Sequence, residues 1–251
     1  MIVTEVIHWF GNGGHWEGQD GVPTRFAQHL VISGEAMLIA SAIALPIAIV
    51  LGHLGRGGFL AINVSNIGRA VPSFAILVLA AQIPAIGVGD TAAEVALIAL
   101  ALPPIVTNTY VGMTSVDPEV KEAALAMGMS GAQVLRRVEL PLALPLILAG
   151  LRTSAVQVIA TATLAAEVAA GGLGRYIVDG IAESDYAQVW AGALLVGGLA
   201  LAVDGIFAVG QRRVARKSGR RPLRRGQVIQ GSAELISEAA SETAGAATLA
   251  G

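Results

Sequence analysis

Long apolar stretches separated by shorter polar connections dominate this chain. A helix needs about 20 predominantly apolar residues, at ~1.5 Å each, to cross a hydrocarbon core of ~30 Å. Five stretches reach that length, so the pattern predicts an all-α, polytopic membrane protein of about five transmembrane helices. The predicted spans run from about Leu30 to Leu51, Leu60 to Ile83, Ala92 to Met113, Leu140 to Val168 and Val189 to Val209.

The composition agrees with this pattern. Hydrophobic residues make up 54% of the 251 positions and charged residues only 14%, a balance typical of membrane proteins rather than water-soluble ones. The absence of cysteine excludes disulfides, thiolate metal sites and cysteine nucleophiles. Residues 1–20 carry Glu5 and Glu17 but no basic residue. They lack the charged start of a cleaved signal peptide, and we expect them to be retained.

Basic residues are unevenly distributed among the predicted connections. Lys and Arg resist translocation, so they gather on the cytoplasmic side of a membrane. Eight of the 16 basic residues fall between Arg212 and Arg225. If this end is cytoplasmic, five spans place the N-terminus outside, with only Arg25 and Arg175 there. The basic residues placed inside are Arg56, Lys121, Arg136, Arg137 and the C-terminal cluster.

These patterns divide the chain into three parts. We expect an extracytoplasmic segment of residues 1–29, a transmembrane domain of residues 30–210 and a cytoplasmic tail of residues 211–251. The tail is first basic and then, after Arg225, too poor in large apolar side chains to form a core, which predicts disorder. A basic run can contact nucleic acid or anionic lipid. Beside a span, a topogenic or lipid-facing role is favoured, and nucleic acid is not an expected partner.

A polar connection, residues 115–139, joins the third and fourth predicted spans and contains clear helix-capping signals. Asp117 can cap a helix that starts with Pro118, where a missing N–H costs nothing. Gly128 can end this helix in the left-handed conformation. Ser130, with Gln133 three residues later, has the pattern of a capping box. We therefore expect two short helices that meet at a glycine hinge.

The same connection contains a motif of fixed spacing. An EAA triplet is followed after three residues by Gly, and after nine more by Val, one further residue, Leu and Pro; these positions are Glu122, Ala123, Ala124, Gly128, Val138, Leu140 and Pro141. This arrangement resembles the EAA motif of permease subunits from binding-protein-dependent ABC importers. Every position fits, with valine where the motif has Ile or Val. The residues alone leave open an ordinary cytoplasmic loop with good helix caps.

Further segments carry a narrower resemblance. They are Asn108-Thr109-Tyr110, Val116-Asp117-Pro118, Gly128-Met129, Glu139 to Pro145, Thr161 to Ala166 and Gly171 to Gly174. They resemble the osmoprotectant branch of these permeases, whose cargoes are glycine betaine, carnitine and choline. The resemblance covers residues from about Leu30 to Val209. Glu167 departs from it, because an apolar residue is expected beside the glycine-rich segment.

The resemblance implies a type I ABC importer permease-like bundle in a bacterial inner membrane. Its coupling segment would insert into a groove on a separate cytoplasmic ABC ATPase, which binds the ATP and Mg, so no cofactor is expected in this chain. The small side chains of Ala123 and Ala124 permit close approach, and Glu122 offers a charge-assisted hydrogen bond. Further implied partners are a second permease copy or a sibling permease, and an extracytoplasmic solute-binding protein.

Two alternatives are weighed against this interpretation. The nearer is an ABC permease for an amino acid such as methionine. The more distant is a membrane-embedded enzyme, but no GxSxG nucleophile elbow occurs and the four histidines do not form a metal-ligand pair at helical spacing. An ATP-binding loop of the form GxxxxGK is excluded, because the only lysines are Lys121 and Lys217. We therefore expect a transporter subunit without a catalytic site.

Ionisable side chains inside predicted spans are candidates for pathway or structural roles, because burying charge in hydrocarbon is expensive. Arg69 could snorkel towards the cytoplasm or act at a gate. Arg152 lies ~18 Å along its helix from Leu140 and should face protein or water, with a structural ion pair preferred. Asp204 is an acid at plausible depth, although the sequence does not define its partner.

Two further features concern packing and selectivity. Gly150, Ser154, Ala162 and Ala166 give the fourth span a small-residue face suited to a subunit seam or pathway wall. The spans contain few aromatic side chains to surround a quaternary ammonium group. We therefore expect an external binding protein to supply selectivity, with the segment from Gly171 to Tyr186 as its docking surface.

Overall fold

Helices account for all regular structure in the part of the chain that the computed structural model describes, which comprises residues 2–58, Asn63 and residues 71–217. Four helices in this part are long and apolar enough to cross a membrane. They are α2 (Val22–His53), α5 (Asp90–Thr114), the continuous helical stretch Gly131–Val168 and α10 (Tyr186–Lys217). The all-α polytopic prediction is confirmed. Of the predicted second span, α4 (Ser73–Ala81) is described, whereas Arg69 lies outside the described residues.

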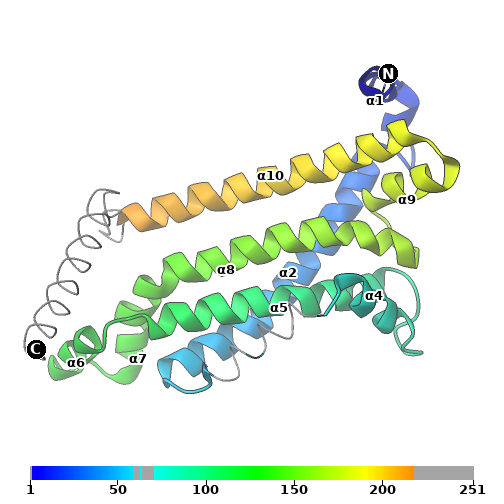
Figure 1. Cartoon of the computed structure of the whole chain (residues 1–251). Coiled ribbons are helices and arrows are strands. Elements are labelled where there is room, and N and C mark those ends of the chain that lie inside the picture. The colour runs from blue at the N-terminus through cyan, green and yellow to red at the C-terminus, as the bar shows by residue number, and fades with distance from the viewer. Residues whose placement is uncertain (1, 59–62, 64–70, 218–251) are drawn as a thin grey trace, which may run out of the picture. The chain divides into compact units, whose positions relative to one another are not determined.

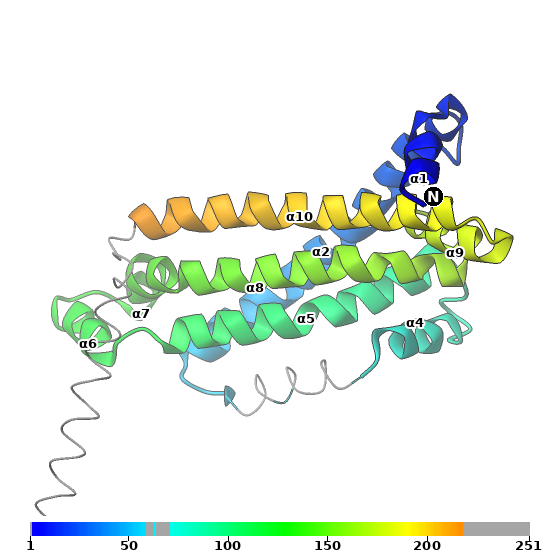
Figure 2. The ribbon, with the colours of Figure 1, turned by 45° about the horizontal axis from the view of Figure 1, so that its top comes forward.

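Three long helices lie side by side in the bundle (Figures 1 and 2). α2 and α5 run in the same direction, and α8 (Leu140–Thr161) runs antiparallel to both. α4 lies against the first half of α5, and α10 extends along α8. The first predicted span begins earlier than expected, at Val22 rather than about Leu30, because Pro23 occupies the first turn of α2, where proline is favoured.

A stripe of alanines holds α2 close to α5. Ala36, Ala40, Ala44 and Ala48 recur every four residues and have no exposed surface. The first three pack in one cluster with Leu97, Ala101 and Ile105 of α5. Small side chains let helix backbones approach closely in a membrane, where water exclusion does not drive helix association. The four-residue spacing of this stripe is visible in the sequence.

The α5–α8 contact uses two members of the small-residue face on the fourth span. Gly150 is buried beside Asn108 and Pro104. The hydroxyl of Ser154 donates a hydrogen bond to the carbonyl oxygen of Ala101 over 2.8 Å. Gly150 and Ser154, which were expected at a subunit seam or pathway wall, instead lie in the contact between α5 and α8 of the same chain.

Gly150→Ala is expected to lower the thermal stability of the protein. An added Cβ would lie 2.7 Å from Asn108 Cβ and 2.9 Å from the Pro104 carbonyl oxygen, so α5 and α8 must separate. Overpacking of this kind costs ~1–3 kcal/mol. Thermal unfolding in detergent measures the effect. Gly197→Ala on α10 is the matched control, because its Cβ meets nothing within 4 Å; an equal fall in both variants would contradict the close contact.

The two ends of the bundle differ in what they carry. α1 (Ile2–Gly11), the 3-10 turn η1 (Gly13–Trp16) and α9 (Gly174–Glu183) lie at one end, and α6 (Pro118–Ala126) and α7 (Gly131–Val134) lie at the other (Figure 1). At the first end Trp9 packs edge-on against Tyr176. The Tyr176 hydroxyl donates a 2.5 Å hydrogen bond to the Asp20 carbonyl oxygen, and burial raises the pKa of this hydroxyl.

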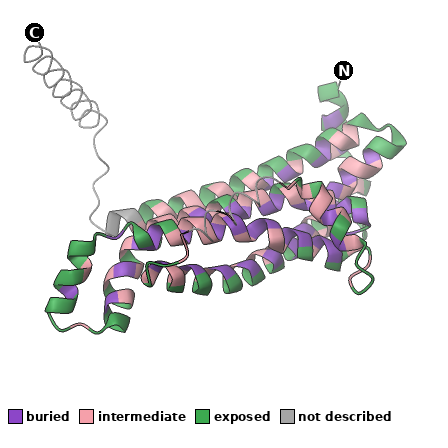
Figure 3. Ribbon diagram, turned by 60° about the horizontal axis from the view of Figure 1, so that its bottom comes forward, coloured by how far each residue is buried: buried purple, intermediate pink, exposed green. Residues whose placement is uncertain are grey.

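Burial follows the helix contacts (Figure 3). Buried positions lie where helices meet, and the outward faces carry large apolar side chains such as Leu201 and Ile206, which are 74% and 70% exposed. In water such surfaces would drive aggregation. On helices long enough to span a bilayer they are suited to contact lipid or another membrane subunit.

Candidate functional site

The first half of the coupling segment, residues 115–139, folds as its caps predict. α6 begins at Pro118, and the Asp117 side chain accepts a 2.9 Å hydrogen bond from the Glu119 backbone N–H. The helix ends before Gly128, whose φ of 86° lies in the left-handed region. Glycine is favoured there because it has no Cβ to clash with the backbone. The predicted caps and the glycine turn of the first helix are confirmed.

The second half begins as predicted but continues further. Ser130 and Gln133 form a capping box, in which the Ser130 N–H donates to Gln133 Oε1 over 2.8 Å and the Gln133 N–H donates to Ser130 Oγ over 3.4 Å. α7 then runs without a break through a π-helical turn, η2 (Leu135–Glu139), into α8. The expected second short helix is thus the first part of the fourth span, because nothing between Gly131 and Leu140 interrupts the backbone.

The EAA residues lie on both faces of α6. Glu122 and Ala123 are exposed, whereas Ala124 is buried against the bundle. The exposed face also carries Leu125 and, just beyond the helix end, Met127, which are 52% and 77% exposed. An exposed apolar surface next to a charge is typical of a protein–protein contact. This end of the bundle therefore offers a surface on which another subunit can dock.

The later motif residues connect the coupling segment to the spans. Val138 and Leu140 are half-buried, and Leu140 packs against the cluster of Met113, Ala143 and Ile147. Pro141 is exposed and directly follows the π-helical turn inside the continuous helical stretch, where it has no N–H to donate to the preceding turn. These residues serve packing between the segment and the bundle rather than an outward contact.

Glu139, which lies between Val138 and Leu140 in the sequence, is a buried carboxylate that sequence reasoning missed. Glu139 is 1% exposed, and its Oε1 lies 2.8 Å from Lys121 Nζ of α6. Its Oε2 lies 2.5 Å from Nδ1 of His53, the last residue of α2. The one available signal was a charged residue at the position that the motif leaves unspecified, between Val138 and Leu140.

Arg152 and Asp204, candidates from separate spans, lie together. Arg152 Nε donates to Asp204 Oδ1 over 2.6 Å and Nη2 donates to Oδ2 over 2.7 Å, a bidentate pair. Arg152 Nη1 also donates to Gln211 Oε1 over 3.2 Å. Such pairing neutralises two charges within apolar helices, so the geometry favours a link between α8 and α10.

The glycine-rich segment is less exposed than a docking surface requires. Leu173 has no exposed surface, Tyr176 is 7% exposed, and the Gly172 N–H donates to Gln28 Oε1 of α2 over 3.0 Å. The exposed part of the expected surface lies later, at Ile181 and Tyr186. Glu167 is also exposed, in the 3-10 helix η3 (Ala162–Val168).

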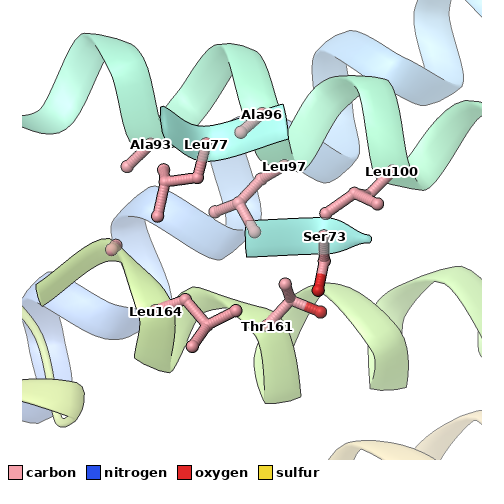
Figure 4. Close-up of a pocket in the computed structure, with 9 residues that line it drawn as sticks. Ser73, Leu77, Ala93, Ala96, Leu97, Leu100, Thr161 and Leu164 are labelled. Carbon is pink, nitrogen blue, oxygen red and sulfur yellow. The ribbon is translucent and has the colours of Figure 1, made fainter. Parts of the chain in front are cut away.

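One small pocket lies between α4, α5 and the region where α8 passes into η3 (Figure 4). Only the Ser73 and Thr161 hydroxyls interrupt its apolar lining. None of its lining residues is aromatic, so it lacks the ring faces that usually hold a quaternary ammonium group. The lining residues are Ser73, Leu77, Ala93, Ala96, Leu97, Leu100, Thr161, Leu164 and Ala165.

A further carboxylate, Glu35, lies within α2. Glu35 is exposed, although it falls inside a helix long and apolar enough to span a membrane. A charge at such a position must face water or another protein chain. The side of α2 that carries Glu35 is therefore unsuited to contact lipid.

Comparisons with known proteins agree with this arrangement. The chain is 39% identical over 190 residues to a glycine betaine/carnitine/choline transport system permease of Bacillus subtilis, which covers 76% of this chain and 87% of that protein. It is 38% identical to a carnitine transport permease of Listeria monocytogenes, over 82% of this chain and 90% of the relative. It is 37% identical to an osmoprotectant import permease of Salmonella typhimurium, over 75% of this chain and 80% of that relative.

Solved structures show the same fold. An inward-facing methionine ABC transporter matches with a TM-score of 0.60 at 24% identity, over 77% of this chain and 94% of the other. An amino acid ABC transporter matches with the same TM-score at 20% identity. Residues 44–216, which include the coupling segment, match the family described as "binding-protein-dependent transport system inner membrane component". The chain belongs to this family of transport permeases.

Proposed function

We propose that this chain is the permease subunit of an ATP-driven importer for osmoprotectants such as glycine betaine, carnitine or choline. The observation that carries the proposal is α6, a capped helix at one end of the bundle with Glu122, Ala123 and Leu125 exposed for a partner. The cargo class rests on the relatives, which are named as permeases for these solutes.

The coupling segment would transmit conformational changes of a separate ATPase to the membrane spans. Two cytoplasmic ABC ATPase subunits bind ATP and Mg, and one of them receives α6 through its exposed residues Glu122 and Ala123, whereas Ala124 is buried and packs α6 within the permease. Closure of the ATPase pair displaces α6. Because α7 is continuous with α8, this displacement tilts the span and opens the cavity outward, and hydrolysis resets it. This cycle is alternating access driven by a separate motor, with no catalytic site or cofactor in the permease itself.

The end that carries α6 would be cytoplasmic. Arg56, Lys121, Arg136 and Arg137 belong to this end, and Arg25 and Arg175 belong to the elements at the other. This asymmetry follows the positive-inside bias. The N-terminus is then extracytoplasmic and the basic residues from Arg212 onwards meet the cytoplasm and anionic lipid. Arg69, which lies outside the described residues, keeps the snorkelling or gating role expected from its sequence position.

The assembled importer would need further chains. A second copy or a sibling permease completes the passage, and an extracytoplasmic solute-binding protein delivers the cargo. Nucleic acid has no place in this assembly. The small number of aromatic side chains in the spans supports a passage of low affinity, with selectivity supplied by the binding protein. Of the expected docking surface, Ile181 and Tyr186 are the residues best placed to meet that protein.

A reconstitution experiment tests this function. The permease, its ATPase and its binding protein are assembled in liposomes with ATP on the cytoplasmic face. We expect ATP-dependent uptake of labelled glycine betaine that carnitine or choline reduces and methionine does not. Uptake of methionine alone would favour the amino-acid alternative. Chemical conversion of a substrate without its transport would favour a membrane-embedded enzyme.

A further inference from the structure

We propose that Glu139 is a positioning residue that joins the coupling helix to two membrane spans and passes the displacement of α6 to them. The inference rests on the proposed function and deepens it. The EAA motif specifies the residues on either side of Glu139 but leaves its own position open.

The geometry brings three elements to one carboxylate. Glu139 ends the π-helical turn that leads into α8, Lys121 belongs to α6 and His53 ends α2. Each oxygen of the carboxylate has its own partner, with Oε1 at 2.8 Å from Lys121 Nζ and Oε2 at 2.5 Å from His53 Nδ1. A displacement of α6 thus acts on α2 and α8 through a single side chain.

Burial makes this joint resistant to opening. The Glu139 side chain is 2% exposed, whereas those of Lys121 and His53 are 24% and 29% exposed. A buried carboxylate that loses its partners is left uncompensated in a low-dielectric site, which is strongly unfavourable. When α6 moves, keeping Glu139 paired is therefore favoured over leaving it behind. The two partners retain some contact with solvent, so the penalty of separation is smaller for them than for Glu139.

Apolar packing gives α6 little alternative attachment. Within α6, which the structure describes in full, Ala124 is the only buried residue. The methyl group of one alanine offers a small contact area, so it holds the helix weakly against a lateral pull. The charge-assisted contact of Lys121 with Glu139 is the stronger attachment.

The π-helical turn supports the assignment. Its wider backbone ring is closed by the Leu140 N–H, which donates to the Leu135 carbonyl oxygen five residues earlier. Such turns are rare and occur frequently at functional sites. Here the turn buries Glu139 while Arg136 and Arg137, on the same turn, remain exposed. Of the charged side chains on this turn, the acidic one is therefore the one that lies inside the protein.

The test uses the complete importer in liposomes. In Glu139→Gln and Lys121→Met, ATPase subunits should still co-purify and basal ATP hydrolysis should persist, but solute taken up per ATP should fall about tenfold, as the loss of a charge-assisted contact implies. Lys121→Arg keeps the ion pair and should retain most uptake per ATP. Glu5→Gln, an exposed carboxylate on α1, is the control and should behave as the wild type.

A second measurement does not depend on transport. Because the chain has no cysteine, spin labels at Val120→Cys on α6 and Leu54→Cys after α2, in permease diluted with unlabelled permease, report the distance between these two positions within one chain. We expect a narrow distance distribution that broadens in Glu139→Gln. An unchanged distribution, or full uptake per ATP in Glu139→Gln, would overturn the joint. Failure of the wild type to bind the ATPase or take up solute would instead contradict the proposed function.

Discussion

Gly128→Val is expected to abolish most ATP-driven uptake while the protein remains in the membrane. The turn after α6 requires a φ of 86° at this position. A β-branched residue disfavours that conformation by ~1–2 kcal/mol or more. Space is not the obstacle, because an added Cβ would meet nothing within 4 Å. The substitution thus changes the direction in which α6 leaves the hinge and little else.

The measurement is uptake of labelled solute by cells or proteoliposomes, normalised to permease in the membrane. Gly131→Ala is the matched control, since it lies three residues later, also has free space around its Cβ and has no positive φ. Replacement of the exposed Glu122 by Lys should reduce uptake as Gly128→Val does, because it reverses the charge offered to the ATPase. Normal uptake in both Gly128→Val and Glu122→Lys would remove the lever mechanism.

Single replacement of Arg152 or Asp204 by Leu is expected to remove most of the folded protein, whereas replacement of both is expected to restore much of it. Each single variant leaves one charge unpaired on helices that are long and apolar enough to span a membrane, where an unpaired charge is costly, whereas the double variant leaves none. The bidentate geometry, at 2.6 and 2.7 Å, makes the two side chains one unit.

The amount of membrane-inserted, monodisperse protein and its unfolding temperature measure this effect. Asp179→Ala provides the control, because its pair with Arg175 is an i,i+4 contact on α9, which is not one of the four helices long and apolar enough to cross a membrane, and such a pair contributes little. If the double variant is as poor as either single variant, an unpaired charge is not the cause of the loss, and the expectation is contradicted.

The sequence predicted the features that depend on local chemistry. The caps at Asp117 and Ser130 and the left-handed Gly128 follow from side-chain reach and backbone sterics over a few residues. The apolar lengths of α2, α5 and α10 follow from the thickness of the bilayer. The depth of Arg152 and Asp204 followed in the same way, so each was identified as a candidate.

Features that depend on which helix faces which were not available from one sequence. The pairing of Arg152 with Asp204 requires the rotation of α8 relative to α10. The joint at Glu139 requires the end of α2, 86 residues earlier, to lie beside the π-helical turn. Gly150 and Ser154 were visible as a small-residue face, but only the packing shows that α5 fills it.

Cross-linking from Ala123→Cys tests the central claim most directly, since this exposed position lies within the EAA triplet and the chain has no other cysteine. A thiol-to-amine reagent applied to inside-out vesicles containing the assembled importer should join the permease to its ATPase, and an impermeant maleimide should reach the cysteine only from the cytoplasmic side. Labelling from the outer side, or an assembled complex in which this cysteine reaches no ATPase, would contradict the account.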